Sequence, residues 1–409
     1  MTSFIIEHQC PQCGAPAELE ETDRLFRCEF CRVGSFLSMP KFFRYTIPHN
    51  APSGEEVIYY PYWRFKGMLF SCLDRKIEKR FLDVSQQALR SHHFPVNIGF
   101  RGQTQKLRFA AAEEEGAFIK PQRPFGEVLG DWTRQYSAKL RDRILHQDYI
   151  GETYSLIYAP YYLKRQVIDG VLNQPASSLR VDEMEDGLLQ TESPRWPINF
   201  LATLCPQCGW DLEGDRDSLA LNCNNCHTVW WAKKDALSQL KAAHVKRSGD
   251  GWVYLPFWRI QADVSTVALK SYADLIKIAN LPKVPQPGWE QRPFYFWNPA
   301  FKVRPQSYLT IATNVTLNQP VEDLESGQPK GERHAVNLPL NEAVESLKLN
   351  LANFMKPRER RQELLPQITV KARRFLLIYI PFKDTHHELV QPDLNLALSK
   401  NMLAHAKNL

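Results

Sequence analysis

The sequence predicts an α+β protein that is a tandem duplication. Each half is expected to consist of a four-cysteine zinc ribbon followed by a mostly antiparallel sheet domain with an amphipathic helix. Three observations predict this fold. The pentapeptide CPQCG occurs twice, at residues 10–14 and 205–209. Each copy precedes a second C-x-x-C pair at the same distance, and an aromatic strand follows each ribbon at one offset of 195 residues.

The cysteines form two quartets with the spacing of a zinc ribbon. In both, fourteen residues separate the two C-x-x-C pairs, and a short β-hairpin between the pairs would bring four thiolates around one tetrahedral ion. Four cysteines close the coordination sphere, so we expect two structural zinc ions and no catalytic residue. The predicted ligands are Cys10, Cys13, Cys28, Cys31, Cys205, Cys208, Cys223 and Cys226.

His227 follows the last ligand of the second ribbon and is a bystander in this interpretation. The corresponding residue of the first ribbon is Arg32, which cannot bind zinc. The glycine after each first pair lets the backbone turn so that N–H groups face the sulfurs.

An aromatic strand follows each ribbon, VIYYPYWRFKG at residues 57–67 and WVYLPFWRIQAD at residues 252–263. Alternation predicts that Tyr and Trp of each strand point to one side and pack in the core, with the proline at an edge or a bulge. An aromatic platform for a peptide, a base or a lipid headgroup is the alternative. Arg64 and Arg259, which follow the tryptophans, pair with a carboxylate or stack on a ring.

Further elements repeat less closely. The segment at 155–170 resembles that at 376–391, and residues 94–110 align loosely with 294–312 as strands. A helix is predicted where Trp132, Tyr136, Leu140 and Ile144 recur every fourth residue. A second helix is predicted with Asn341 as its cap and Val344, Leu347, Leu351 and Phe354 on one face.

These patterns give five segments. They are zinc ribbon 1 at 1–40, α+β domain 1 at 41–180, a linker at 181–199, zinc ribbon 2 at 200–235 and α+β domain 2 at 236–409.

Composition is typical of a globular protein, with 44% hydrophobic and 23% charged residues and a net charge of +6. The chain lacks an apolar stretch long enough to span a bilayer and a secretory signal at its start. Eight of nine cysteines in C-x-x-C pairs suit a reducing compartment, so we expect a cytoplasmic protein. The ninth, Cys72, lies in an apolar segment and is expected to be buried.

The ribbons and the Y-x-P-Y/F-W strands together resemble a group of bacterial proteins with transcription-factor-type zinc ribbons, in which a Y-L-P-F-W strand follows the ribbon and a Y-x-x-P strand closes the domain. Some members carry a label that refers to the primosomal helicase. This sequence has no Walker A loop and no helicase motif, so the resemblance implies no helicase activity. The group's function is unassigned.

No common catalytic motif occurs, and an enzyme with a site between the two halves is the third hypothesis. The pairs His92-His93 and His386-His387 are expected at the surface. Spacing predicts no partner for Asp83, Asp169 or Asp263.

Basic residues form two clusters, which either flank a helix end or contact phosphates. The first hypothesis for function is a non-enzymatic adaptor with a protein partner. The second is nucleic-acid binding, with an anionic membrane surface as a related partner. The clusters are Arg75, Lys76, Lys79 and Arg80, and Lys356, Arg358, Arg360, Arg361, Lys371, Arg373 and Arg374.

Overall fold

The computed structural model describes residues 4–38, 42–99, 106–111, 114–140, 142–184, 189–196, 198–233, 236–284, 286–320 and 323–406. The chain forms two compact units. Unit 1 comprises residues 1–66, 82–140 and 153–202, and unit 2 comprises residues 67–81, 141–152 and 203–409. Two segments of the first half of the sequence are therefore built into unit 2.

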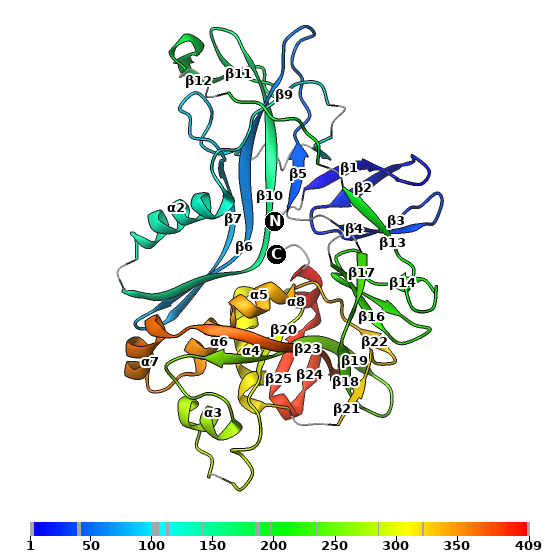
Figure 1. Cartoon of the computed structure of the whole chain (residues 1–409), viewed down its shortest axis with the longest axis vertical. Helices are drawn as coiled ribbons and strands as arrows, with labels where there is room; N and C mark the ends of the chain where they lie inside the picture. Colours follow the sequence, from blue (N-terminus) through cyan, green and yellow to red (C-terminus); the bar gives the residue numbers. More distant parts are fainter. Residues whose placement is uncertain are drawn as a thin grey trace. The chain divides into compact units, whose positions relative to one another are not determined.

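A large mixed sheet contains most strands of the first half (Figure 1). Its strand order is β12-β11-β10-β5-β8-β1-β2, and β6 pairs with β10, β7 and β9. The strands are β1 (Ile5–Gln9), β2 (Pro16–Glu20), β5 (Phe43–Thr46), β6 (Ile58–Leu73), β7 (Ile77–Gln87), β8 (Leu107–Phe109), β9 (Ala117–Phe118), β10 (Ile144–Leu163), β11 (Gln166–Asp169) and β12 (Pro175–Arg180). A separate small sheet has the order β13-β4-β3, with β3 (Leu25–Arg27), β4 (Gly34–Ser38) and β13 (Asn199–Ala202).

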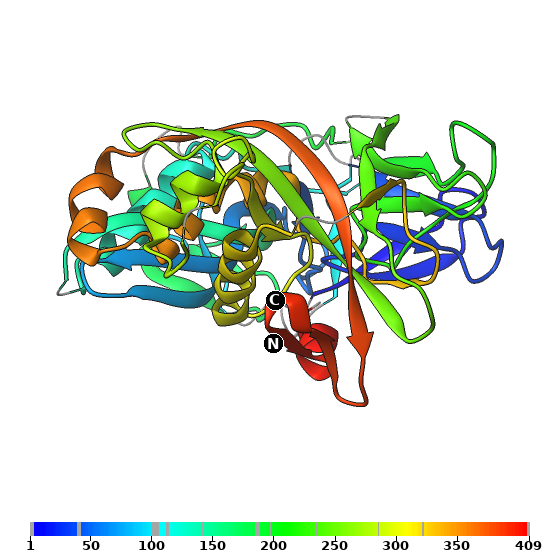
Figure 2. The same cartoon turned by 90° about the horizontal axis from the view of Figure 1, so that it is seen from below.

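Unit 2 contains a second mixed sheet and the sheet of the second ribbon. The larger has the order β20-β19-β23-β18-β21, with β22 and β24 paired to β19 and β23. Figures 1 and 2 show its two long strands, β19 and β23, lying side by side. Its strands are β18 (Ala242–Val245), β19 (Trp252–Val264), β20 (Phe296–Pro299), β21 (Leu324–Ser326), β22 (Glu332–Arg333), β23 (Val370–Asp384), β24 (Glu388–Gln391) and β25 (Leu396–Ser399). The ribbon sheet is β14 (Leu212–Glu213), β15 (Ala220–Cys223), β16 (Val229–Lys233) and β17 (Ala236–Leu240).

In the described part of the chain helices are few, so the protein is mixed α+β and mostly sheet. They are α2 (Phe125–Ser137), α3 (Tyr272–Ala279), α4 (Pro305–Asn318), α5 (Leu340–Glu345), α6 (Leu347–Phe354), α7 (Arg358–Leu364) and α8 (Lys400–His405), with 3₁₀ turns η1 (Val181–Glu183), η2 (Leu365–Gln367) and η3 (Pro392–Leu394).

The two large sheets share their central strand order. The order β7-β6-β10-β5-β8 of the first half corresponds to β20-β19-β23-β18-β21 of the second. In the first, Tyr158 of β10 lies opposite Thr46 of β5 in a parallel pair. In the second, Tyr379 of β23 lies opposite His244 of β18, also in parallel. Strands β5 and β18 thus each run parallel to a long strand of their own sheet.

One side-chain hydrogen bond recurs in both halves. The indole Nε1 of Trp63 donates to the carbonyl of Arg123 at 2.8 Å, and that of Trp258 donates to the carbonyl of Leu338 at 3.0 Å. Backbone contacts around it recur as well, because Ala88 N donates to the Pro61 carbonyl at 2.9 Å as Ala300 N does to that of Pro256 at 3.0 Å. Such a matched set extends the similarity well beyond the cysteines.

The aromatic strands pack as alternation predicts. Tyr59 and Trp63 belong to one buried cluster of unit 1, while Tyr60 and Tyr62 belong to another. The core-packing interpretation is confirmed, since all four rings are at most 6% exposed. The expected edge position of the proline is wrong, because β6 and β19 pair on both sides. Pro256 lies instead between the segments of β19 that pair with β22 and with β20.

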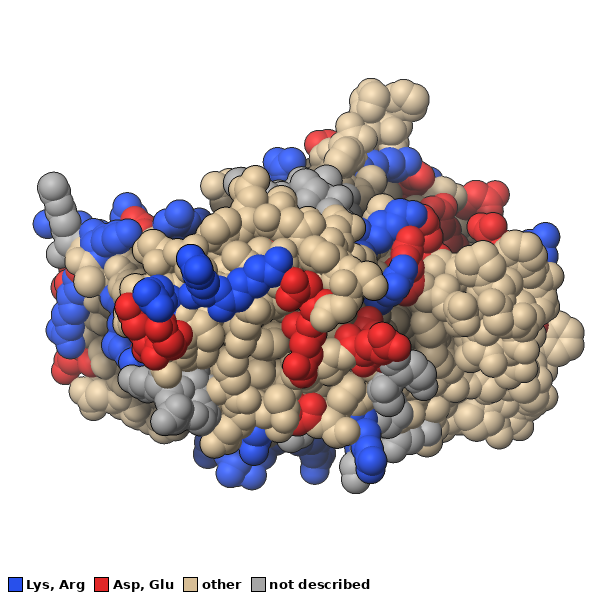
Figure 3. All heavy atoms as spheres, turned by 90° about the horizontal axis from the view of Figure 1, so that it is seen from above, with Lys and Arg blue, Asp and Glu red and all other residues tan. Residues whose placement is uncertain are grey.

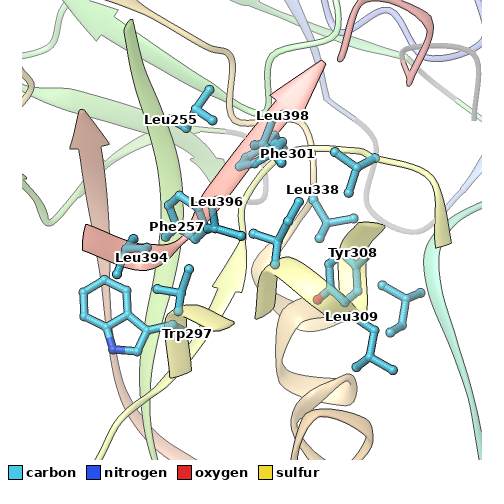
Figure 4. Packing of buried hydrophobic residues seen from close by; sticks show 14 of the residues in the cluster. Leu255, Phe257, Trp297, Phe301, Tyr308, Leu309, Leu338, Leu394, Leu396 and Leu398 are labelled. Atoms are coloured by element: carbon cyan, nitrogen blue, oxygen red, sulfur yellow. The ribbon is translucent and has the colours of Figure 1, made fainter. Parts of the chain in front are cut away.

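In unit 2 the same alternation separates two clusters. Leu255 and Phe257 of β19 face a core that includes α4 and the C-terminal strand β25 (Figure 4). Tyr254 and Trp258 face the other core, which includes α3. Phe70 of β6 packs in the first of these cores, with its ring centroid 6.2 Å from that of Tyr308 on α4.

Several predicted elements are wrong. The first helix ends at Ser137 rather than reaching Ile144, which begins β10. Asn341 lies inside α5, whose N-cap is Pro339, and the predicted second helix breaks at Ser346 into α5 and α6. The segment predicted as strands at 294–312 forms β20 and then helix α4, because Pro305 begins a helix there. Of residues 94–110, those at 100–105 lie outside the described part and only β8 is a strand.

The strand before the second ribbon pairs differently from its counterpart. Strand β1 precedes the first ribbon and pairs with β2 from Ile5 to Gln9. The corresponding β13, whose first residue lies in the predicted linker, pairs instead with β4 of the first ribbon. One isolated bridge, between Leu204 and Asp211, retains the β1–β2 pattern in the second ribbon. The predicted hairpin between the cysteine pairs is present in the second ribbon, as β14 and β15, whereas β2 and β3 belong to different sheets.

Candidate metal centres

The structure gathers the predicted ligands into two groups of four. Within each group the Sγ atoms all lie within 4.8 Å of one another. In the first, the closest pairs are Cys10 and Cys31 at 3.8 Å and Cys13 and Cys28 at 3.6 Å. A tetrahedral zinc ion with bonds of about 2.3 Å separates its sulfurs by about 3.8 Å. The donor set and its spacing therefore fit zinc.

The second group is equally compact, with 3.6 Å between the Sγ atoms of Cys205 and Cys226 and 3.4 Å between those of Cys208 and Cys223. In both groups the first and third cysteines are buried, the second is exposed and the fourth is half-buried. All four positions are sulfur, so a bound ion would have no open site for water or substrate.

Tight turns place the sulfurs in both ribbons. Gly14 and Gly209 have φ of 70° and 72°, a conformation that favours glycine, and their N–H groups donate to the carbonyls of Cys10 and Cys205. Arg32 and His227 occupy matching left-handed positions, with φ of 64° and 56°. The second group of four consists of cysteines, and His227 is not one of its members.

Hydrogen bonds around the sulfurs shift the pKa values of the thiols in both directions, with that of Cys31 raised to about 11. The backbone N–H of Cys31 donates to the Cys28 thiol and lowers the pKa of Cys28 to about 6. In the second ribbon the hydroxyl of Thr228 lies 3.0 Å from Sγ of Cys226 and accepts a bond from the indole of Trp230 at 2.8 Å. Such outer contacts orient metal ligands.

A loop of unit 2 contacts the backbone of the second ribbon. The buried side chain of Gln328 donates through Nε2 to the carbonyl of Cys223 at 2.8 Å. Gly327, with φ of 91°, brings the loop so close that a Cβ there would lie 2.8 Å from the carbonyl oxygen of His227. The sequence did not predict this hydrogen bond, because Gln328 and Cys223 are 105 positions apart.

A buried charge cluster joins the first ribbon to β6. Arg64 donates to Asp83 through Nε at 3.0 Å and through Nη2 at 3.1 Å, and it donates through Nη1 to Glu21 in the turn between β2 and β3. Its guanidinium also lies 3.9 Å from the centroid of Phe4. Lys66 lies on the same strand and is 1% exposed. Sequence reasoning left the partner of Arg64 open and missed Glu21 and Lys66.

The corresponding arginine of the second half takes the other predicted role. Arg259 lies over the ring of Tyr295, 4.6 Å from its centroid. Arg64 thus both pairs with carboxylates and stacks on a ring, while Arg259 stacks on a ring. The sequence does contain one sign of this cluster. Two cationic residues, Arg64 and Lys66, alternate along the aromatic strand of the first half.

The remaining candidates are engaged in structural contacts. His92, His386 and His387 are exposed as predicted, but His93 is buried and bonds the Arg180 carbonyl through Nε2 at 3.1 Å. Asp169 is buried and accepts from the backbone N–H of residues 171 and 172.

Several residues of the basic clusters form hydrogen bonds or ion pairs within unit 2. Arg358 and Arg361 donate to the backbone carbonyl of Asp74, at 2.9 and 3.4 Å, and Arg373 pairs with Asp263 at 2.5 Å. Spacing had indicated no partner for Asp263, and that expectation is wrong. On the face shown in Figure 3, basic and acidic side chains are interspersed.

Cys72 is buried as predicted, at 1% exposure. Burial raises the pKa of its thiol to about 12. A thiol in this state is a poor nucleophile, so Cys72 serves packing.

Comparison with family models, curated proteins and solved structures finds no match for this chain. No helix in the described part of the chain is both long and apolar enough to cross a membrane.

Proposed function

We propose that this chain is a non-enzymatic, zinc-stabilised adaptor built from two copies of one module and acting in the cytoplasm. The two four-cysteine groups carry the proposal, because closed coordination suits a structural ion and offers no open site for chemistry. The duplication is supported by the shared strand order, by the parallel pairing of β5 with β10 and of β18 with β23, and by the recurring indole hydrogen bond. The resemblance to bacterial zinc-ribbon proteins stays a prediction.

Large apolar side chains at the cysteine turns are the proposed contact points. Phe30, between the third and fourth cysteines of the first ribbon, is 69% exposed. Trp210 follows the first turn of the second ribbon and is 58% exposed, and Leu204 before it is 52% exposed. Metal coordination would hold the backbone at these residues rigid, which lowers the entropy cost of binding a partner.

The test is affinity capture from cells that encode the chain, with cross-linking and mass spectrometry to locate contacts. Cross-links to a protein partner near Phe30 or Trp210 are expected, and Phe30→Asp or Trp210→Asp should abolish capture. Val284→Asp is the matched control, because Val284 is 82% exposed but lies outside both ribbons. Equal capture by all three variants, or recovery of nucleic acid alone, would contradict the proposal.

A further inference from the structure

Within the residues that the structure describes, the buried charge cluster occurs in the first half and not in the second. Residue 66 is lysine in β6, while residue 261, at the equivalent place in β19, is glutamine. Asp83 is likewise replaced by Tyr295, which stacks under Arg259. The second sheet has the same pairing without these charges. The sheet therefore does not need the cluster, and its charges require another explanation.

Glu21 is the member of the cluster that the ribbon supplies. It lies in the turn between the second and third cysteines, and its side chain is 0% exposed. The turn is held by Asp23, which accepts from the backbone N–H of Glu20 at 2.8 Å. Coordination by the flanking cysteines would fix the position of this turn, so the place of the Glu21 carboxylate depends on the ribbon being folded.

The guanidinium of Arg64 relies on this carboxylate for one of its two ionic partners. Arg64 bonds it directly, and burial lowers the pKa of Lys66 while the charge of Glu21 opposes that effect. Among the residues that the structure describes, Nζ of Lys66 and Oε2 of Glu21 have no hydrogen-bond partner. Without Glu21, the buried guanidinium of Arg64 would keep Asp83 as its remaining carboxylate partner. An uncompensated buried charge is strongly destabilising.

The second ribbon contacts the loop after β22 through an amide, and Arg333 of β22 donates to Asn224 of this ribbon at 2.8 Å. The buried carboxylate of Asp217 accepts from the side-chain amide of Asn337 at 2.7 Å. Displacing this ribbon would take the Asp217 carboxylate from the Asn337 amide, which costs less than taking a carboxylate from a buried guanidinium.

We propose that zinc occupancy of the first ribbon controls the order of β6 through Glu21, while the second ribbon exerts no such control over β19. The inference rests on the proposed zinc binding. Loss of the ion would release the turn, remove the carboxylate from Arg64 and Lys66, and loosen the strand that carries them.

Hydrogen exchange of the full-length protein, before and after removal of zinc by a chelator, tests the inference. The amides at 60–66 of β6 should exchange at least about tenfold faster after zinc removal, and those at 255–261 of β19 should change less than about twofold. In the zinc-loaded protein, Glu21→Gln should accelerate the β6 amides with zinc content unchanged.

A grafted variant separates charge from simple loss of packing. Glu21→Gln, Lys66→Gln and Asp83→Tyr together remove the three charges around Arg64 and give positions 66 and 83 the residues of the second half, Gln261 and Tyr295. In this variant zinc removal should no longer accelerate β6 more than it does β19. If the grafted variant responds as the wild type does, or if β19 responds as strongly as β6, the inference is overturned while zinc binding stands. A purified chain without zinc would instead overturn the proposed function.

Discussion

Replacing Gly327 by alanine should weaken the second zinc site and leave the first intact. An alanine at φ of 91° costs about 1–2 kcal/mol because the left-handed region disfavours a Cβ. The Cβ would also lie 2.8 Å from the carbonyl oxygen of His227, so the loop must move. That movement breaks the bond from Gln328 to the buried carbonyl of Cys223, which costs about 1–3 kcal/mol.

Loss of the Gln328 hydrogen bond destabilises the zinc-loaded ribbon, so it should lower the affinity of the second site for zinc by about tenfold to hundredfold. Gly331 provides the matched control, since its φ is 112° and a Cβ there meets nothing within 4 Å. Gly331→Ala should lower the stability of the protein through the same backbone strain, with the zinc affinity of the second site unchanged.

Zinc transfer to a chromogenic chelator measures this difference. One ion of the two should be released at about tenfold to hundredfold lower chelator concentration from Gly327→Ala, and alkylation with mass spectrometry should assign the freed thiols to residues 205–226. Release of both ions at the same chelator concentration as in Gly331→Ala would refute the reasoning.

Three further predictions concern the cores and the basic cluster. After zinc removal at pH 8, eight thiols should be alkylated, and Cys72 should be spared until the chain is denatured. Burial raises the pKa of Cys72 to about 12, so its contribution to the free energy of unfolding should fall as the pH rises above about 8.5. Denaturant titrations at two pH values can check this. Trp63→Phe and Trp258→Phe should each lower the free energy of unfolding by about 1–3 kcal/mol, because each strands a buried carbonyl; a marked difference between the two in urea unfolding would argue against equivalent roles. Arg358→Ala should accelerate hydrogen exchange around Asp74, and unchanged exchange there would show that this contact is not maintained in solution.

The features predicted from sequence were those that depend on local spacing. The cysteine quartets and the alternation of Tyr59 and Trp63 follow from the geometry of turns and strands, and the structure contains both. The role of Arg64 could not be decided, because its partner Glu21 is forty-three positions away. The segment at 294–312 was misread because its apolar residues are compatible with a strand and with a buried helix, which periodicity cannot separate.

Zinc content and coordination of the purified chain test the central claim most directly. We expect about two zinc ions per chain, each with four sulfur ligands at about 2.3 Å by X-ray absorption spectroscopy. Less than about one zinc per chain, nitrogen or oxygen atoms bound to the ion, or eight freely titrating thiols in the native protein would contradict the account.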